Sequence, residues 1–197
     1  MKNLTFNSIE NWSNMIMVVF FSALASCQSN AETSNNTSDS DMPSMTIHEA
    51  VFMGNFEAVK AHVKAKTDLN EKDAYGSAPL SIAATFGKTD VAKLLINSGA
   101  DLNIKSADGS TPLHTSSFLC RVEIVKALLD KGADLTIRNN FGSTALESVS
   151  GPFQEVKMVY EQLSKNLGPF GLKLDFDYIE KTRPQVADML SAKKINK

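Results

Sequence analysis

The sequence predicts an all-α solenoid of about four helix-turn-helix units, joined by short β-hairpin turns and closed by a C-terminal helical cap. The first observation is a repeat of 33 residues, which aligns Gly76 with Gly109 and Gly142. Comparing 73–105 with 106–138 finds 12 identities in 33 positions, where average composition gives roughly two. A period of this length is typical of stacked units that bury their apolar faces against one another.

Apolar residues inside each unit have the spacing of two helices. In the second unit Leu80, Ala83 and Ala84 form one stripe, and a second stripe follows at residues 91–95. Thr111-Pro112 is a polar cap followed by proline at the first helical position, where the missing N–H costs nothing. The spacing therefore predicts two antiparallel helices per unit.

Two motifs indicate the kind of repeat. Thr111-Pro112-Leu113-His114 is followed by Gly132-Ala133-Asp134, and Ala78-Pro79-Leu80 is followed by Gly99-Ala100-Asp101-Leu102-Asn103. This pattern resembles the ankyrin repeat. The resemblance extends over about 46–168 and implies units at about 46–72, 73–105, 106–138 and 139–168, of which the outer two act as caps.

The period breaks after Leu167. Gly168-Pro169-Phe170-Gly171 predicts a turn, and two short helices are expected at 177–182 and 184–194, separated at Pro184. We expect 169–197 to cover the end of the stack through Ile179, Val186, Met189 and Leu190, because a solenoid needs a terminal cap. A docking element for a partner is the alternative.

Residues 1–26 have the pattern of an export signal. Met15–Leu24 is an apolar run of ten residues, too short for a membrane span. It ends in Leu24-Ala25-Ser26-Cys27, which resembles the lipobox of bacterial lipoproteins and implies lipidation of Cys27. Residues 27–45 are polar and predict a flexible tether. A hydrophobic leader with a chance cysteine is the alternative, since the segment before the apolar run is only weakly basic.

Composition and motifs argue against catalysis. A net charge of −2 gives no electrostatic case for nucleic acid, and no spacing of Cys and His suits a metal. His48 and His114 hold the same position of the repeat, where the resemblance implies hydrogen bonds to neighbouring turns. Cys120 lies six residues beyond His114, about 9 Å along a helix and too far to be activated. We expect no cofactor, no metal and no enzyme activity.

The candidate partner-binding residues are apolar side chains at positions that face the concave side of an ankyrin stack. Together they predict a continuous apolar strip, and exposed strips of this kind mark interfaces. Burial of some of these rings in the core is the alternative, above all for Phe86 and Phe118. The strip comprises Phe52, Met53, Tyr75, Phe86, Phe118, Leu119 and Phe141.

These features together predict a non-catalytic, monomeric protein-interaction module that is anchored in a bacterial cell envelope by a lipid on Cys27. By the resemblance, Gln28 after this cysteine favours the periplasmic face of the outer membrane. The alternative function is a protective or inhibitory partner of an envelope enzyme, either an oxidative-stress enzyme or a toxin. The identity of the partner stays open.

Overall fold

The structure is a computed structural model that describes residues 45–195. The predicted signal peptide at 1–26, the lipidation site Cys27 and the tether up to residue 44 lie outside the described residues. Within 45–195 no helix is both long enough and apolar enough to cross a membrane.

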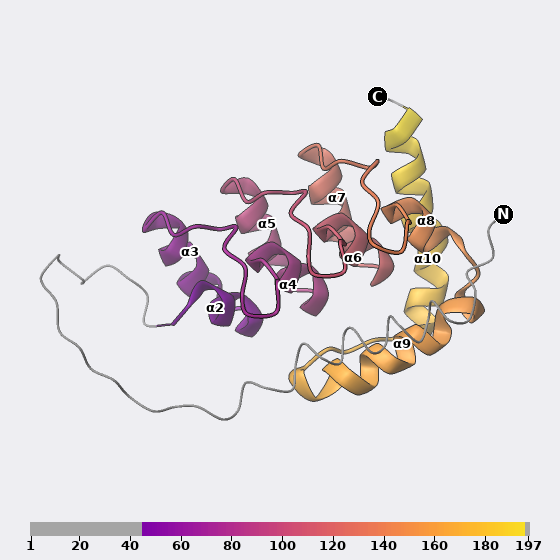
Figure 1. Cartoon of the computed structure of the whole chain (residues 1–197), viewed down its shortest axis with the longest axis horizontal. Helices are drawn as coiled ribbons and strands as arrows, with labels where there is room; N and C mark the ends of the chain where they lie inside the picture. Colours follow the sequence, from indigo (N-terminus) through magenta and orange to yellow (C-terminus); the bar gives the residue numbers. More distant parts are fainter. Residues whose placement is uncertain (1–44, 196–197) are drawn as a thin grey trace, which may run out of the picture.

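Two layers of short helices make up the stack (Figure 1). The inner layer contains α2 (Ile47–Met53), α4 (Pro79–Phe86), α6 (Pro112–Phe118) and α8 (Ala145–Ser150). The outer layer contains α3 (Phe56–Lys64), α5 (Thr89–Asn97) and α7 (Val122–Asp130). Each inner helix packs on the next inner helix, and each outer helix on the next outer one. The all-α repeat architecture is confirmed.

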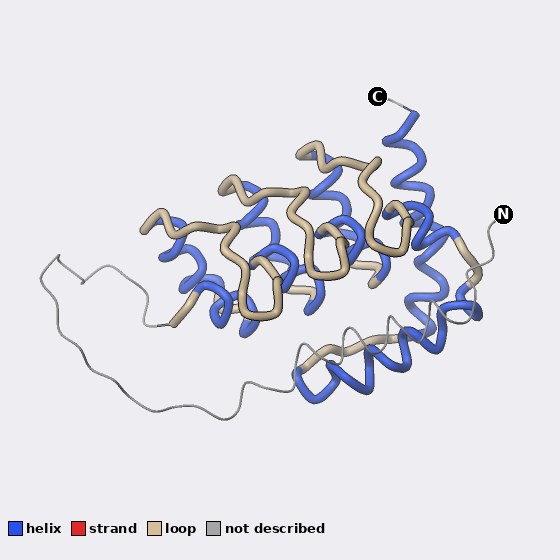
Figure 2. The backbone as a smooth tube through the Cα atoms, viewed as in Figure 1, coloured by secondary structure: helices blue, strands red, loops and turns tan. Residues whose placement is uncertain are grey.

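The loops between units project as hairpins, yet residues 45–195 contain no strand (Figure 2). Each tip is closed by a few hydrogen bonds: the Asp73 amide donates to the Ser77 carbonyl over 3.0 Å, and the Gly76 amide to the Asp73 carbonyl over 2.9 Å. Gly76 has φ 75°, in the left-handed region that glycine adopts without strain. The predicted hairpin turns are therefore present as tight loops.

Helix boundaries follow from local chemistry. Thr46 and Glu49 form a capping box at the start of α2, and Thr111 and His114 form one at the start of α6. The bend between the two helices of a unit needs one left-handed residue. Gly87 supplies it in the second unit with φ 64°, whereas Cys120 has φ 52° in the third. The third unit thus holds a side chain where glycine is favoured.

The fourth unit departs from the repeat after α8. The next helix, α9 (Phe153–Leu167), does not continue the outer layer; it runs back along the inner helices and ends in the short 3-10 helix η1 (Gly168–Phe170). The last helix, α10 (Phe176–Ile195), packs on α8, α7 and α6 and closes the stack. The predicted C-terminal helical cap is therefore present, and α10 supplies it. Helix α9 does not cap the end of the stack but lies along its inner helices.

The prediction of two C-terminal helices is wrong. The chain forms one helix, α10, which continues through Pro184. Its buried residues recur with helical spacing at Ile179, Arg183, Val186 and Leu190. Interior proline costs about 3 kcal/mol. Burial of the three apolar side chains Ile179, Val186 and Leu190 contributes about 1.5–3 kcal/mol each, which together outweighs the cost of the proline.

Candidate functional site

A groove of about 440 Å³ runs along the concave side of the stack. We call it the concave groove. Its floor is formed by the inner helices and one wall by the hairpin loops, including Tyr75, Ser77 and Asp108. A volume in this range is typical of ligand-binding sites.

Aromatic rings line the groove near the start of the stack. Phe52 of α2 and Phe86 of α4 make an edge-to-face contact, with ring centroids 4.8 Å apart at an interplanar angle of 82°. Both rings are half-buried, as is Tyr75 in the adjoining hairpin loop. Phe52 and Phe86 hold each other in place, and all three rings keep part of their surface available, which is the arrangement of side chains that anchor a partner.

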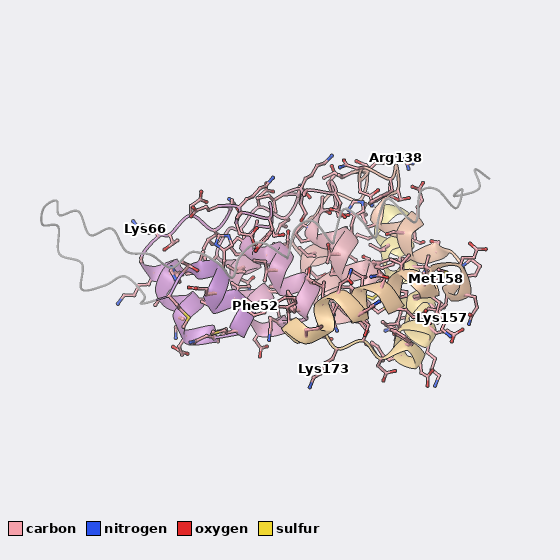
Figure 3. The ribbon with its side chains drawn as sticks, turned by 60° about the horizontal axis from the view of Figure 1, so that its bottom comes forward. Phe52, Lys66, Arg138, Lys157, Met158 and Lys173 are labelled. Carbon is pink, nitrogen blue, oxygen red and sulfur yellow. The ribbon has the colours of Figure 1, made fainter. Side chains whose placement is uncertain are left out.

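Helix α9 provides a second wall, opposite the hairpin loops. Leu163 and Leu167 of α9 line the groove together with Phe118 and Ile82. Figure 3 shows α9 crossing the face on which Phe52 lies, with Met158 nearer the α10 end. An open concave surface is thereby converted into a cleft with a floor and two walls.

Three buried side chains hold α9 against the stack. Tyr160 is completely buried and stacks on Phe118, with ring centroids 4.5 Å apart. Its hydroxyl donates to the Phe118 carbonyl over 2.6 Å and accepts from Nη1 of Arg183 over 2.8 Å. Nη2 of Arg183 donates to the Gly151 carbonyl over 2.9 Å. Burial raises the pKa of Tyr160, so the hydroxyl stays protonated and can donate.

The structure places the seven predicted partner-binding residues in three groups. Phe52, Tyr75 and Phe86 line the groove and are half-buried. Phe118 and Leu119 also border it, but only 8% and 4% of their surfaces are exposed. Met53, which is 65% exposed, and Phe141 lie outside the lining of the groove.

Two expectations of the sequence therefore need correction. Phe118 and Leu119 are not part of an exposed strip, because Tyr160 covers the Phe118 ring and both residues belong to the hydrophobic core. The strip is also not continuous from Met53 to Phe141. The accessible aromatic surface of the groove is concentrated around Phe52, Tyr75 and Phe86.

Three acidic residues contribute to the lining of the groove. Glu49, Asp73 and Asp108 line it, and within residues 45–195 no lysine or arginine does. The backbone amide and the hydroxyl of Thr46 donate to Glu49 and lower the pKa of that carboxyl, so it is ionised at neutral pH. The concave groove therefore combines apolar rings with negative charge.

The histidines have the structural role that the resemblance implies. Nε2 of His48 lies 2.9 Å from the Glu71 carbonyl oxygen, and Nε2 of His114 lies 3.0 Å from that of Ser143. Burial lowers the pKa of His114, which keeps its ring neutral. The two capping boxes differ by one residue: Glu49, directly after His48, closes the box of α2, whereas His114 itself closes the box of α6.

Cys120 is buried among structural contacts rather than placed for catalysis. It is 1% exposed, its thiol lies 3.7 Å from the Ile179 carbonyl oxygen, and burial raises its pKa to about 11. A thiol of this kind stays protonated at neutral pH. In the described part of the chain, no group of three or more His, Cys, Asp or Glu side chains is arranged to hold a metal.

Comparison with known proteins agrees with this geometry. Residues 47–139 match the family model described as Ankyrin repeats (3 copies). The crystal structure of the ankyrin repeat domain of Bcl-3, described as a unique member of the IκB protein family, has a TM-score of 0.50 and 28% sequence identity to this chain. The match covers 52% of this chain and 45% of the Bcl-3 chain. No curated protein sequence matches this one.

Residues 47–139 thus have the ankyrin-repeat fold, which generally serves as a non-catalytic scaffold for protein–protein interaction. The family match ends at residue 139. Helices α9 and α10 lie beyond it, and they contribute the second wall of the groove and the cap.

Sequence reasoning missed the contribution of α9. Leu163, Leu167 and Tyr160 have the spacing of an ordinary buried helix face, which predicts a helix but not the surface it covers. One signal was available: α9 has 15 residues, whereas each outer helix of the preceding units has 9. A helix of that length extends beyond the layer formed by its neighbours.

Proposed function

We propose that this chain is a protein-binding module that holds its partner in the concave groove. The observation that carries the proposal is the set of half-buried rings at Phe52, Tyr75 and Phe86, which lie on the floor and hairpin wall of one cleft. Aromatic side chains in such positions dominate the affinity of many interfaces, at about 2 kcal/mol or more each. A protein partner also agrees with the general use of ankyrin repeats.

Site-specific photo-crosslinking in cells tests this proposal. A photoreactive amino acid replaces Tyr75 in the groove or, as the control, Met158, which is 65% exposed on α9 and outside the groove lining. We expect a discrete covalent adduct with a protein from position 75 and none of the same mass from position 158. Adducts that are equal at both positions, or absent at position 75, would refute binding in the groove.

A second experiment asks whether the rings act in binding or in folding. Phe52→Ala and Tyr75→Ala are each combined with the crosslinker at the other position. Because both rings are only half-buried, we expect the adduct to weaken severalfold or more while the folded fraction, measured by circular dichroism, stays the same. Unfolding of these variants would assign the rings to the core.

We further propose that the module is attached to the bacterial envelope by a lipid on Cys27, at the periplasmic face of the outer membrane. The support is the lipobox-like Leu24-Ala25-Ser26-Cys27 together with the apolar run before it. Labelling with radioactive palmitate tests the anchor: the wild type should incorporate label and Cys27→Ala should not. The same result for both proteins contradicts the anchor, and fractionation of inner and outer membranes tests the location.

A further inference from the structure

We propose that the concave groove recognises a peptide segment that places lysine or arginine beside apolar side chains. This inference rests on the proposed function and adds the chemistry of the partner. Three features of the groove support it: the sign of the charge in its lining, the fact that the loops do not require this charge, and the volume between the two walls.

The charge of the lining has one sign. Glu49 comes from α2, and Asp73 and Asp108 come from two successive hairpin loops. Within the described residues no lysine or arginine lines the groove, and the ring of His114 is neutral. Acidic residues on three elements therefore line one cleft that has no lysine or arginine in its lining, and a bound cation would be attracted to it.

The loop that contains Asp73 does not require a negative charge at this position. Its Oδ1 accepts from the amides of Tyr75 and Ser77 over 2.9 and 2.8 Å. Two repeats later the uncharged Asn139 makes the same two hydrogen bonds: its Oδ1 accepts from the amides of Phe141 and Ser143, both over 3.1 Å. An amide oxygen is therefore sufficient to close this loop.

Glu49 has a neutral counterpart too. It accepts from the Thr46 amide over 2.9 Å and from the Thr46 hydroxyl over 3.0 Å. In the third unit the neutral His114 fills the same role, since its Nδ1 accepts from the amide and lies 2.8 Å from the hydroxyl oxygen of Thr111. The charges at Asp73 and Glu49 are thus available for recognition because the backbone geometry does not depend on them.

The volume limits the size of the occupant. About 440 Å³ between the hairpin loops and α9 holds a few side chains. Half-buried rings at Phe52, Tyr75 and Phe86 form apolar surface next to the carboxylates. The complementary ligand is a short segment whose apolar side chains contact these rings while an adjacent cationic side chain meets the carboxylates.

Binding of two labelled peptides to the full 197-residue chain tests the inference. The peptides have equal length and the same Leu and Phe positions, and they carry either lysine or glutamate at every polar position. Three favourable charge pairs at partly exposed sites predict about tenfold tighter binding of the lysine peptide, measured by fluorescence anisotropy at low salt. The preference should shrink as salt rises from about 0.01 M to about 1 M.

A matched pair of triple variants assigns the effect to the groove. Glu49→Gln/Asp73→Asn/Asp108→Asn removes three charges and keeps one acceptor oxygen at each position, which the Ser110 amide still needs at residue 108. Glu57→Gln/Asp101→Asn/Asp134→Asn removes three charges outside the groove, two of them from loop carboxylates that also accept backbone amides. We expect the preference for lysine to disappear in the first variant and to persist in the second, with equal melting temperatures.

The remaining outcomes separate this inference from the proposed function. Equal binding of the two peptides, tighter binding of the glutamate peptide, or no binding of the lysine peptide would each overturn the basic-segment inference. Loss of preference in both triple variants would also overturn it, because net charge alone would then explain the result. In any of these cases a protein crosslinked from position 75 would still support the proposal that a partner binds in the concave groove.

Discussion

One hydroxyl group makes two of the buried hydrogen bonds that hold α9 against the stack, and Tyr160→Phe removes this hydroxyl. The Tyr160 hydroxyl bridges the Phe118 carbonyl and the Arg183 guanidinium, with hydrogen bonds of 2.6 and 2.8 Å. The side chain is completely buried, and Arg183 is only 3% exposed. Water therefore cannot replace the lost partner at either group.

The expected loss follows from these two hydrogen bonds. A neutral hydrogen bond contributes about 1 kcal/mol, and one to a charged group contributes about 1.5–3 kcal/mol. Their sum predicts that the free energy of unfolding falls by about 3 kcal/mol in Tyr160→Phe. For a domain of this size that corresponds to a decrease of about 6–12 °C in the melting temperature.

Urea unfolding of the full chain, followed by circular dichroism, measures the effect. Tyr178→Phe is the matched control. It removes the same hydroxyl from α10, but from a side chain that is 49% exposed, so the loss of stability should stay within about 0.5 kcal/mol. Equal and small losses in both variants would refute the reasoning, since Tyr160 would then not hold α9 in place.

Three further outcomes follow from local geometry. Lys66→Gly should stabilise the protein by about 0.5 kcal/mol in urea unfolding, because Lys66 is exposed and has φ 57°; destabilisation would contradict left-handed strain. In a Cys27→Ser background, Cys120 should react with a disulfide reagent at pH 7.5 on the order of a hundredfold more slowly when folded than when unfolded; equal rates would contradict its burial. The Arg138 guanidinium, by hydrogen bonding, lowers the pKa of Glu147 from 4.5 to about 2, so this carboxylate stabilises the fold above pH 4.5 and loses that effect as the pH falls towards 2. Glu147→Gln should remove this contribution to the pH dependence of the melting temperature. The change should be small because the ion pair is about half exposed, and an unchanged pH profile would contradict the assignment.

Much of the stack could be predicted because its determinants are local. A proline at the first helical position, a capping box or a left-handed glycine acts within a few residues, and the 33-residue period repeats these signals. The same reasoning found the unusual position of Cys120, since it stands where Gly54 and Gly87 stand. The structure gives φ 52° there.

The second wall of the groove could not be predicted because it depends on contacts distant in sequence. Phe118 is buried by Tyr160, 42 residues later, and Arg183 reaches Tyr160 from α10. The continuity of α10 through Pro184 could not be predicted for a similar reason: local rules end a helix there, whereas burial of Ile179, Val186 and Leu190 against the stack holds the helix together. Periodicity shows that a helix has an apolar face but not what covers it.

Nuclear magnetic resonance of the methyl-labelled full chain tests the central claim most directly, which is that a ligand lies between the hairpin loops and α9. During titration with the lysine peptide, we expect the methyl signals of Ile82, Leu163 and Leu167 to shift together, because all three line the groove. Those of Leu95 and Leu128, fully buried in the outer helices α5 and α7, should stay in place. Saturable shifts confined to the outer helices, with Leu163 and Leu167 unchanged, would contradict the account.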